Sequence, residues 1–433
     1  MLADIAALFL AVWGAHLVRF PRYFRDNALR ELLSHPGLLI VGVAAAIALA
    51  TAAELYESTV LRRRVETLTR VVAVATAWAG ALALASYVVP VWKFGRGLLA
   101  LSALGWVVGA AVVRGVTARW LAWRPRAVAL VIGEPAAAVS VAAKLREHPL
   151  SPWMAEDGSS LQPSDVAAEV ARVGASLVVL AGRDESPALL EQGLAALHFA
   201  GVPVVAAAEV WAWLDGRLPV GEMSPAAFLH QPGFGAIHSK LFNRVTRVLD
   251  LVLSAVMLVA AIPLLLVAAV LVLLVDGRPV FYRQERVGHF GRVFTMIKLR
   301  TMRRDAEEQG PTFADEDDPR VTGLGRVLRR LRLDELPQLV NVLRGEMSLV
   351  GPRPERPAFV DELARQIPYY TFRLALPPGL TGWAQVNIAY ARTLDEHRRK
   401  LEYDLYFIRE RSLTLYLLTL ARTANAALRG VPR

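Results

Sequence analysis

The sequence predicts a membrane protein of three parts: a region of four transmembrane helices over 1–118, a Rossmann-like α/β domain over 119–222, and, after a linker at 223–239, a mixed α/β domain over 240–433. Three observations lead to this expectation. The 433-residue chain is 55% hydrophobic and only 20% charged, which is typical of membrane proteins with soluble parts. Its first 118 residues contain four separate apolar stretches. Strand-like and helix-like segments then alternate through its middle part.

Composition narrows the classes of function. The formal net charge is +10, and the arginines cluster beside apolar runs. This pattern favours an anionic membrane surface and a phosphorylated substrate over nucleic acid, for which no binding motif is present. The absence of cysteine excludes disulfides, a thiol nucleophile and a cysteine-based zinc site. With 8 histidines and no HExxH motif, any metal is expected to be a hard cation bound by oxygen ligands.

Four apolar stretches make up the N-terminal region, at 2–18, 37–54, 68–89 and 97–113. Each is close to the length that crosses a bilayer, although the first is short and carries Asp4. No Lys or Arg precedes the first stretch and no clear cleavage site follows it, which favours a membrane helix over a signal peptide. The loop arginines slightly favour a cytoplasmic N-terminus. We expect no buried ionisable residues in these helices, which argues against a transport pathway.

The middle region alternates strands expected at 127–133, 175–182 and 202–208 with helices expected at 135–147, 164–172 and 187–199. This alternation predicts a small Rossmann-like domain. Its first turn reads IGEPAAAV and contains one glycine, where the dinucleotide-binding fingerprint contains three. The domain is therefore interpreted as a regulatory or packing module rather than a nucleotide-binding one.

The third region opens with an apolar run at 251–275, with Pro263 at its middle. Proline removes a helix hydrogen bond and bends the axis. Basic residues flank both ends of the run, and a spanning helix would leave one of these clusters on the wrong side of the membrane. A helix over about 247–275 that enters the membrane, breaks at Pro263 and returns keeps both clusters on one side. A proline-kinked spanning helix is the alternative.

The segment 281–307 is rich in cations. Lys298 and Arg300 alternate with Ile297 and Leu299, so both cations would face one side of a strand. Two cations on one face can bind phosphate groups. A solvated edge strand is the alternative interpretation.

An acidic pair, Asp334 and Glu335, begins an amphipathic helix whose apolar residues follow helical spacing over 336–343. Asp334 is expected to be its N-cap, with Pro337 in the first turn. A carboxylate can attack a phosphate only if the phosphate charge is neutralised, which arginines and a divalent cation can do. Covalent aspartyl-phosphates are an established use of this side chain. The alternative is an ordinary pair of residues at a helix start.

A stiff basic loop follows this helix. Pro352 and Pro354 flank Arg353 in the sequence SLVGPRPE. Such bracing is of little use to a surface arginine, whereas a phosphate-binding arginine gains from it.

Three motifs occur in order: RQERVGHFGRVFTMIKLRTM, DPRVTGLGRVLRRLRLDELPQLVNVLRGEMSLVGPRPE and LPPGLTGWAQVN. Over about 242–430 the chain thereby resembles the bacterial sugar transferases, which are monotopic polyprenyl-phosphate sugar-1-phosphate (phosphoglycosyl) transferases. The preceding helices and α/β domain, and the tail KLEYDLYFIRERSLTLYLLTLARTA, look like the long-form members of the exopolysaccharide-biosynthesis, exosortase-associated type.

The resemblance implies a ping-pong transfer of a sugar-1-phosphate from a UDP-sugar to membrane polyprenyl (undecaprenyl) phosphate. Asp334 would attack the β-phosphorus, UMP would leave, and polyprenyl phosphate would resolve the aspartyl-phosphosugar intermediate. Glu335 would assist the metal or the incoming phosphate, and Mg²⁺, held by Asp334 and Glu335, is the implied cofactor. Lys298, Arg329 and Arg353 fall on family positions that line the phosphate site. Arg300 is a further candidate for phosphate binding, because it is expected on the same strand face as Lys298.

The resemblance further implies a multi-pass protein of the bacterial inner (cytoplasmic) membrane with its catalytic domain on the cytoplasmic face. A homodimer is left open. The chain departs from the family in three places: Ile262 precedes Pro263 where the family has serine, 388–392 replaces a Gly-Arg sequence, and Tyr416 stands where many members carry Asp. If that Asp organises the site, we expect a slower enzyme. A catalytically weak membrane scaffold or regulator of polysaccharide assembly is the alternative function.

Overall fold

The computed structural model divides into two compact units, and the division passes through the small α/β sheet. One unit comprises Met1–Leu130, Ala142–Asp157 and Ala168–Leu177, and the other comprises Val131–Val141, Gly158–Ala167 and Val178–Arg433. The structure describes residues 2–428 except 20–35, 53–54, 56–63, 89–95, 124–125, 150, 163, 183–187, 224–227, 229–232, 235–238, 307–317, 389–390 and 392. Most of the linker at 223–239 therefore lies outside the described residues.

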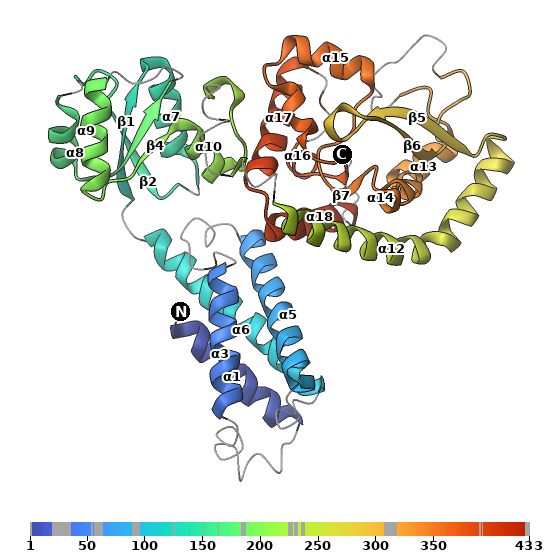
Figure 1. Cartoon of the computed structure of the whole chain (residues 1–433), viewed down its shortest axis with the longest axis horizontal. Coiled ribbons are helices and arrows are strands. Elements are labelled where there is room, and N and C mark those ends of the chain that lie inside the picture. Colours follow the sequence, from blue (N-terminus) through green and yellow to red (C-terminus); the bar gives the residue numbers. More distant parts are fainter. Residues whose placement is uncertain are drawn as a thin grey trace. The chain divides into compact units, whose positions relative to one another are not determined.

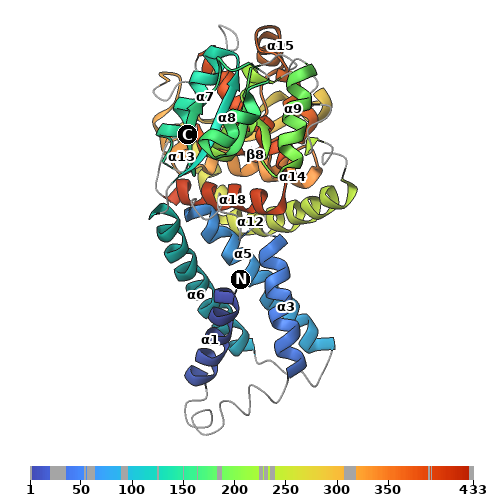
Figure 2. The same cartoon turned by 90° about the vertical axis from the view of Figure 1, so that its left-hand side faces the viewer.

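The N-terminal region is helical, as the sequence predicts. Its helices are α1 (Leu2–Arg19), α3 (Pro36–Ala52), α5 (Arg64–Val88) and α6 (Arg96–Trp123), which lie alongside one another in Figures 1 and 2. Among the described residues, three helical segments are long and apolar enough to cross a membrane: Thr67–Leu84, Gly97–Thr117 and Lys240–Val275. Ile40–Thr51 is a shorter apolar helix. Four N-terminal spans therefore stay a prediction.

Helices α1 and α6 are joined by a buried ion pair. Arg114 Nη1 and Nη2 donate to the two carboxylate oxygens of Asp4 at 2.6 and 3.1 Å, and both side chains are buried. The helices approach closely because Gly105 has no side chain: a Cβ there would lie 3.1 Å from the Cβ of Ala11. The expectation that these helices bury no ionisable residue is therefore wrong. The two charges satisfy each other, since an unpaired charge in an apolar bundle would be far more costly.

The middle region forms the predicted α/β arrangement. Its elements are β1 (Ala127–Gly133), α7 (Pro135–Glu147), β2 (Trp153–Asp157), α8 (Val166–Val173), β3 (Ala175–Ala181), α9 (Ala188–Phe199), β4 (Val204–Ala206) and α10 (Ala207–Asp215). The strand order is β2-β1-β3-β4, with β3 and β4 parallel. Strand β2 was not predicted, because only Ala155 of this strand is buried and no apolar run marks it. The last strand is shorter than the predicted 202–208, because β4 covers only Val204–Ala206 and helix α10 begins at Ala207.

The glycine of the first turn serves packing. Gly133 has φ +123°, and a Cβ there would lie 2.0 Å from the carbonyl oxygen of Ala181 at the end of β3. Only glycine permits this close approach. This close packing accounts for a glycine at position 133 without a bound nucleotide.

The C-terminal region begins with the long helix α12 (Lys240–Val275). It continues with β5 (Phe281–Val287), the 3₁₀ turn η3 (His289–Gly291), β6 (Val293–Leu299), α13 (Gly323–Arg330), η4 (Leu333–Gln338), α14 (Leu339–Arg344), β7 (Ser348–Val350), α15 (Pro357–Gln366), η5 (Tyr370–Ala375), β8 (Gly379–Thr381), α16 (Trp383–Asn387), α17 (Leu394–Arg409) and α18 (Leu413–Leu428). β5 and β6 form an antiparallel hairpin, and β7 pairs with β8 in parallel. The core of this region contains Leu339, Met347, Trp383 and Leu405. It also includes Leu218 and Val220, and Val220 is the first residue of the 3₁₀ turn η1 (Val220–Glu222).

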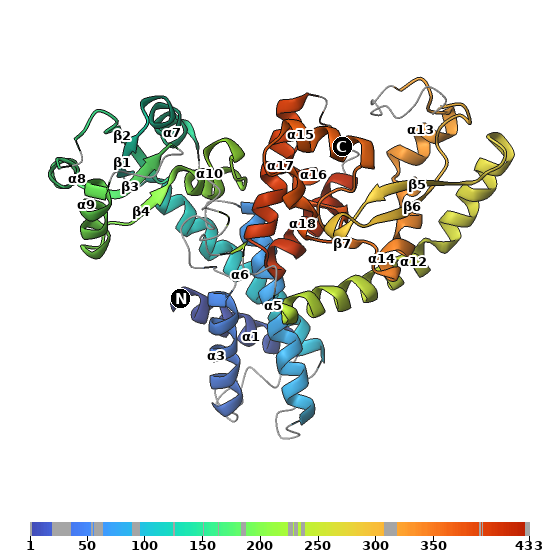
Figure 3. The same cartoon turned by 45° about the horizontal axis from the view of Figure 1, so that its top comes forward.

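Helix α12 contacts the rest of the C-terminal domain with both of its halves. Near its start, Arg247 donates to the carbonyl oxygens of Val342 and Leu343 at 2.6 and 2.8 Å, at the end of α14. Near its end, Ala268 and Val272 pack in a cluster with Leu299 and Leu328. Helical structure continues through Pro263, and Figures 1 and 3 show one curved helix rather than two separate ones. Re-entry into a membrane stays a prediction.

We expect Gly325→Ala to destabilise the C-terminal domain by about 1–3 kcal/mol, the usual cost of overpacking. A Cβ at Gly325 would lie 2.1 Å from the carbonyl oxygen of Thr301. Gly323 begins the same helix, α13, and has nothing within 4 Å of an added Cβ. Gly323→Ala should therefore be neutral or stabilise by up to about 1 kcal/mol. Thermal unfolding in detergent compares the two variants, and equal melting temperatures would contradict the close packing of α13 on Thr301.

Candidate active site

The acidic pair lies on a tight turn between two helices. Helix α13 ends at Arg330, Arg332 takes left-handed backbone angles (φ 56°, ψ 22°), and the 3₁₀ turn η4 then carries Asp334 and Glu335 into α14. The predicted helix is present, but Asp334 is not its N-cap. The left-handed residue starts the turn at Leu333, so Asp334 is already inside it. A positive φ at a non-glycine residue costs free energy and is concentrated at functional sites.

Asp334 and Glu335 lie in different electrostatic environments. Burial, followed by the charge of neighbouring Glu335, raises the pKa of Asp334 to about 6. Burial would also raise the pKa of Glu335, but the charges of Arg353 and Arg332 outweigh it and hold that pKa below its usual value. Arg353 Nη2 donates to Glu335 Oε1 at 3.1 Å, and Arg332 lies 3.8 Å from the other carboxylate oxygen. One carboxylate is thus firmly ionised, and the other titrates near neutral pH.

Lys298 and Arg329 act on the same two carboxylates. Lys298 is in β6 opposite Tyr282 of β5, with its Nζ 5.0 Å from the centre of the Tyr282 ring. Burial, helped by the charges of Arg286 and Arg329, lowers the pKa of Lys298 to about 8. Arg329 comes from α13, and its positive charge limits the rise in the pKa of Asp334. Two residues predicted to bind phosphate therefore gather at the acidic pair.

Arg300 follows β6, and its side chain lies at the end of α12. Its Nη2 donates to the carbonyl oxygens of Asp276 and Gly277, each at 2.6 Å. The guanidinium is buried, and its Nη1 has no hydrogen-bond partner. Arg300 thus fixes the end of α12 while presenting an unsatisfied donor.

The loop that carries Arg353 is held by buried charged residues that were not predicted from the sequence. Buried Arg373 donates to the carbonyl oxygen of Arg353 at 3.1 Å and pairs with Asp404 at 2.7 Å. Arg286 donates to the carbonyl oxygen of Pro354 at 3.0 Å and pairs with Glu355. No sequence signal points to these pairs, because their members lie far apart in the chain and each resembles an ordinary surface charge.

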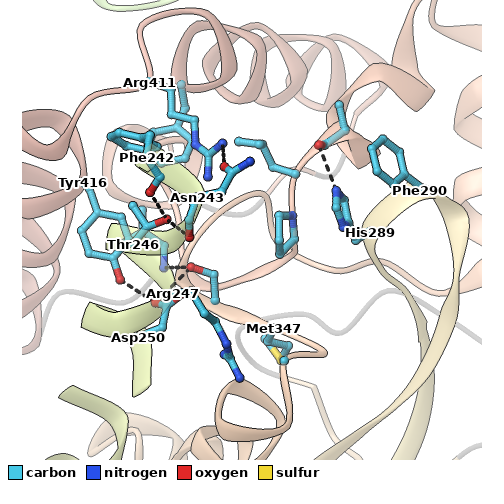
Figure 4. Close-up of a pocket in the computed structure, with 17 residues that line it drawn as sticks. Phe242, Asn243, Thr246, Arg247, Asp250, His289, Phe290, Met347, Arg411 and Tyr416 are labelled. Atoms are coloured by element: carbon cyan, nitrogen blue, oxygen red, sulfur yellow. Dashed lines mark hydrogen bonds between the residues drawn. The ribbon is translucent and has the colours of Figure 1, made fainter. Parts of the chain in front are cut away.

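Tyr416 lies in a separate cavity of about 380 Å³, whose lining includes neither Asp334 nor Glu335. Figure 4 shows Tyr416 directed at Asp250 of α12, and its hydroxyl donates to Asp250 Oδ1 at 2.6 Å. The same carboxylate accepts hydrogen bonds from Ser348 Oγ and the amide of Leu349, at 3.1 and 2.8 Å. Tyr416, one of the positions at which the chain departs from the family pattern, therefore helps to attach α12 to α18 and β7. In the loop at 388–392, residues 389, 390 and 392 lie outside the described residues.

The acidic pair offers limited ligands for a metal. Among the described residues no cluster of three or more His, Cys, Asp or Glu side chains is present. Mg²⁺ is commonly held by one or two carboxylates, with substrate phosphates and water completing its shell. Asp334 and the Glu335 oxygen that does not accept from Arg353 fit that arrangement.

Comparison with known proteins gives one family. The family model described as bacterial sugar transferase matches residues 241–430. A putative undecaprenyl-phosphate N-acetylgalactosaminyl 1-phosphate transferase of Bacillus subtilis is 47% identical over 130 residues, which cover 30% of this chain and 73% of the relative. The chain belongs to the bacterial sugar transferase family.

Two further sugar transferases extend the comparison. The UDP-glucose:undecaprenyl-phosphate glucose-1-phosphate transferase of Caulobacter vibrioides is 43% identical over 186 residues, covering 42% of this chain and 69% of the relative. The UDP-N-acetylgalactosamine-undecaprenyl-phosphate N-acetylgalactosaminephosphotransferase of Aeromonas hydrophila is 39% identical over 241 residues, covering 55% of this chain but only 56% of the relative. The similarity thus covers a part of that relative's length.

The buried pair of Arg373 and Asp404 is expected to be essential to this sugar transferase domain. Both side chains are only 2% exposed, and removal of one member of a buried pair typically costs about 3–5 kcal/mol. Asp404→Ala should therefore lower the unfolding temperature strongly. Asp395→Ala is the control, because Asp395 is 83% exposed in its pair with Arg398 and exposed pairs contribute at most about 1 kcal/mol. Equal effects in a thermal unfolding assay would contradict this role of Arg373.

Proposed function

We propose that this sugar transferase moves a sugar-1-phosphate from a UDP-sugar to membrane polyprenyl phosphate, in the manner of the undecaprenyl-phosphate transferases it resembles. UMP is released, and the product begins an exopolysaccharide repeat unit. The supporting observation is the divided acidic pair: Asp334 has a pKa of about 6, and Glu335 is held ionised by Arg353. The names of the relatives include both N-acetylgalactosamine and glucose, so the sugar is left open.

In the first proposed step, ionised Asp334 attacks the β-phosphorus of the donor. A bond forms between a carboxylate oxygen and this phosphorus, and the bond to the bridging oxygen breaks. That oxygen keeps the electron pair and leaves as part of UMP. Lys298 and Arg329, which already act on Asp334, neutralise the phosphate charge that would otherwise repel the nucleophile.

In the second proposed step, a phosphate oxygen of the lipid acceptor attacks the phosphorus on Asp334. The aspartyl–phosphorus bond breaks, the carboxylate is restored, and polyprenyl-diphosphate-sugar is formed. Arg353 is suited to orient the incoming phosphate because its backbone is fixed by Arg373. When Mg²⁺ is bound at Asp334 and Glu335, it supplies further neutralisation of the diphosphate.

We also propose that α12 enters the membrane from the cytoplasmic face and returns to it, and that the protein resides in the bacterial inner membrane. Both halves of α12 contact the same domain, which a straight spanning helix could do only if part of that domain lay within the bilayer. One face of α12 carries exposed apolar side chains along its whole length, including Leu241, Val252, Val259 and Leu274. A helix lying at the boundary would bury this face in lipid.

Asp334→Asn should abolish UMP release. The variant keeps the size of the side chain but removes the nucleophilic carboxylate. The assay measures UMP from a panel of UDP-sugars with detergent-solubilised protein, Mg²⁺ and undecaprenyl phosphate. Asp361→Asn, on the exposed face of α15, is the matched control and should behave like the wild type. If the folded wild type released no UMP from any donor, the scaffold function would be favoured instead.

The rate of transfer should depend on pH in a bell-shaped manner. Asp334 must be ionised, so kcat/KM should fall as the pH drops below its pKa of about 6. Lys298 must be charged to bind phosphate, so kcat/KM should also fall as the pH rises above its pKa of about 8. Lys298→Arg keeps the charge at all accessible pH values and should move only the alkaline limb upward. An unchanged alkaline limb in this variant would exclude Lys298 as its source.

A further inference from the structure

The cavity of about 380 Å³ that Tyr416 lines is not used by the proposed transfer, because its lining includes neither Asp334 nor Glu335. Its walls come from the start of α12, from η3 and β7, and from the junction of α17 with α18 (Figure 4). We propose that this cavity binds the zwitterionic headgroup of an aminophospholipid, with the primary ammonium at Asp250 and the phosphodiester at Arg411. The inference rests on the proposed position of α12 at the membrane boundary.

One carboxylate oxygen of Asp250 is available to a ligand. Tyr416, Ser348 and the amide of Leu349 all donate to its Oδ1, at 2.6, 3.1 and 2.8 Å. No described residue donates a hydrogen bond to its Oδ2. The side chain is only 3% exposed and lines the cavity. Because a buried charged oxygen without a donor is costly, a ligand that brings N–H donors to this oxygen would be stabilised.

A cation with available donors lines the same cavity. Arg411 is half-buried, its Nη1 donates to Asn243 Oδ1 at 2.6 Å, and its guanidinium lies 4.5 to 5 Å class distance, 4.7 Å, from the centre of the Phe242 ring. No other hydrogen bond joins Arg411 to a described residue. Phosphate oxygens are strong acceptors for a guanidinium. The negative charge of Asp250 acts on Arg411, so the two opposite charges are close enough to be bound by one small ligand.

This pair of opposite charges selects a zwitterion. A simple anion would be repelled by Asp250, and a simple cation would be repelled by Arg411. An ethanolamine phosphodiester carries both charges a few bonds apart, and its ammonium has three N–H donors for the open carboxylate oxygen. A choline headgroup has no N–H donor. Polyprenyl phosphate has no amine, so the proposed acceptor does not fit this cavity.

The surroundings of the cavity fit a lipid. Leu241 and Val248, in the same turns of α12, are 75% and 58% exposed, and such an apolar face can lie in the membrane. Phe290 lines the cavity, is 68% exposed and stacks on the ring of His289, with 4.0 Å between the ring centres. It thus offers apolar surface to the glycerol and the first acyl carbons. At about 380 Å³ the cavity can hold a headgroup, while the acyl chains stay in the membrane.

Native mass spectrometry tests the proposal on the full-length protein in mild detergent, with phosphatidylethanolamine, phosphatidylcholine and phosphatidylglycerol added in equal amounts. The wild type should retain one phosphatidylethanolamine about tenfold over phosphatidylcholine, because a hydrogen bond to a charged group is worth a factor of this order. Asp250→Asn should reduce this preference to about twofold or less, because its amide keeps an acceptor for Tyr416 and presents N–H donors to the ammonium. Arg411→Gln should lower the retention of every phospholipid about threefold to tenfold, because it removes the phosphate contact.

Arg365→Gln is the matched control for the change in charge, because Arg365 is exposed on α15, and it should retain lipids as the wild type does. Thermal unfolding shows whether Asp250→Asn is folded. Arg411→Gln and Ala375→Trp, which narrows the cavity, keep the test decisive if it is not. Ala375→Trp should lose the bound phosphatidylethanolamine.

Equal retention of phosphatidylethanolamine and phosphatidylcholine by the wild type, or retention of neither, would overturn the inference. Unchanged retention in Arg411→Gln and Ala375→Trp would do the same. Glycerophosphoethanolamine carries the same headgroup without acyl chains. If it displaced the lipid at equal concentration, the cavity would be a site for a soluble zwitterion, and the lipid would be rejected as its source.

The UMP-release assay keeps the two proposals apart. Asp334→Asn should lose transfer and keep the preference for phosphatidylethanolamine, because Asp334 does not line this cavity. A wild type with the lipid preference but without transfer would reject the proposed function alone. Transfer by a wild type without the preference would reject the lipid site alone.

Discussion

The C-terminal domain is organised around the electrostatic problem of two adjacent carboxylates, one buried and one half-buried. Asp334 is the buried member, Glu335 is the half-buried one, and their charges repel each other. Such a pair is tolerable only if cations surround it and divide it into one firmly ionised member and one that titrates more readily. The charges of Arg353 and Arg332 lower the pKa of Glu335, and those of Lys298 and Arg329 limit the rise in the pKa of Asp334. The hairpin β5–β6, helix α13 and the proline-rich loop each deliver one of these cations.

The loop that carries Arg353 is itself held by other charged residues. Arg373 and Arg286 each combine an ion pair with a hydrogen bond to a backbone carbonyl of the loop that carries Arg353. Backbone carbonyls have no rotamers, so these bonds fix the loop itself more than they fix any one side chain. Helix α12 is fixed similarly, through Asp250, which joins it to Tyr416 and to the amide of Leu349. The domain is thus a frame of buried polar contacts that supports the acidic pair.

The sequence was most informative where a local pattern carries the structure. Periodic apolar residues marked the N-terminal helices and most of the α/β elements, and the motifs identified the acidic pair and Arg353. Strand β2 was missed because it is mostly exposed and has no apolar run. The 3₁₀ geometry at Asp334 was missed because it follows from the left-handed backbone of Arg332, which its residue type does not reveal. The pair of Arg373 and Asp404 could not be predicted, since only the folded chain brings η5 and α17 together.

The buried pair of Asp4 and Arg114 has a consequence for the order in which the protein is made. The two residues are 110 positions apart, so at about 5–20 residues per second the ribosome reaches Arg114 on the order of 5–20 s after Asp4. During that interval the carboxylate of Asp4 has no partner, and α1 cannot pack against α6. The final packing of α1 therefore waits for α6. The first helix to be synthesised thus obtains its ion pair only when the last helix of the bundle is complete, and a fault in α6 would leave Asp4 without its partner.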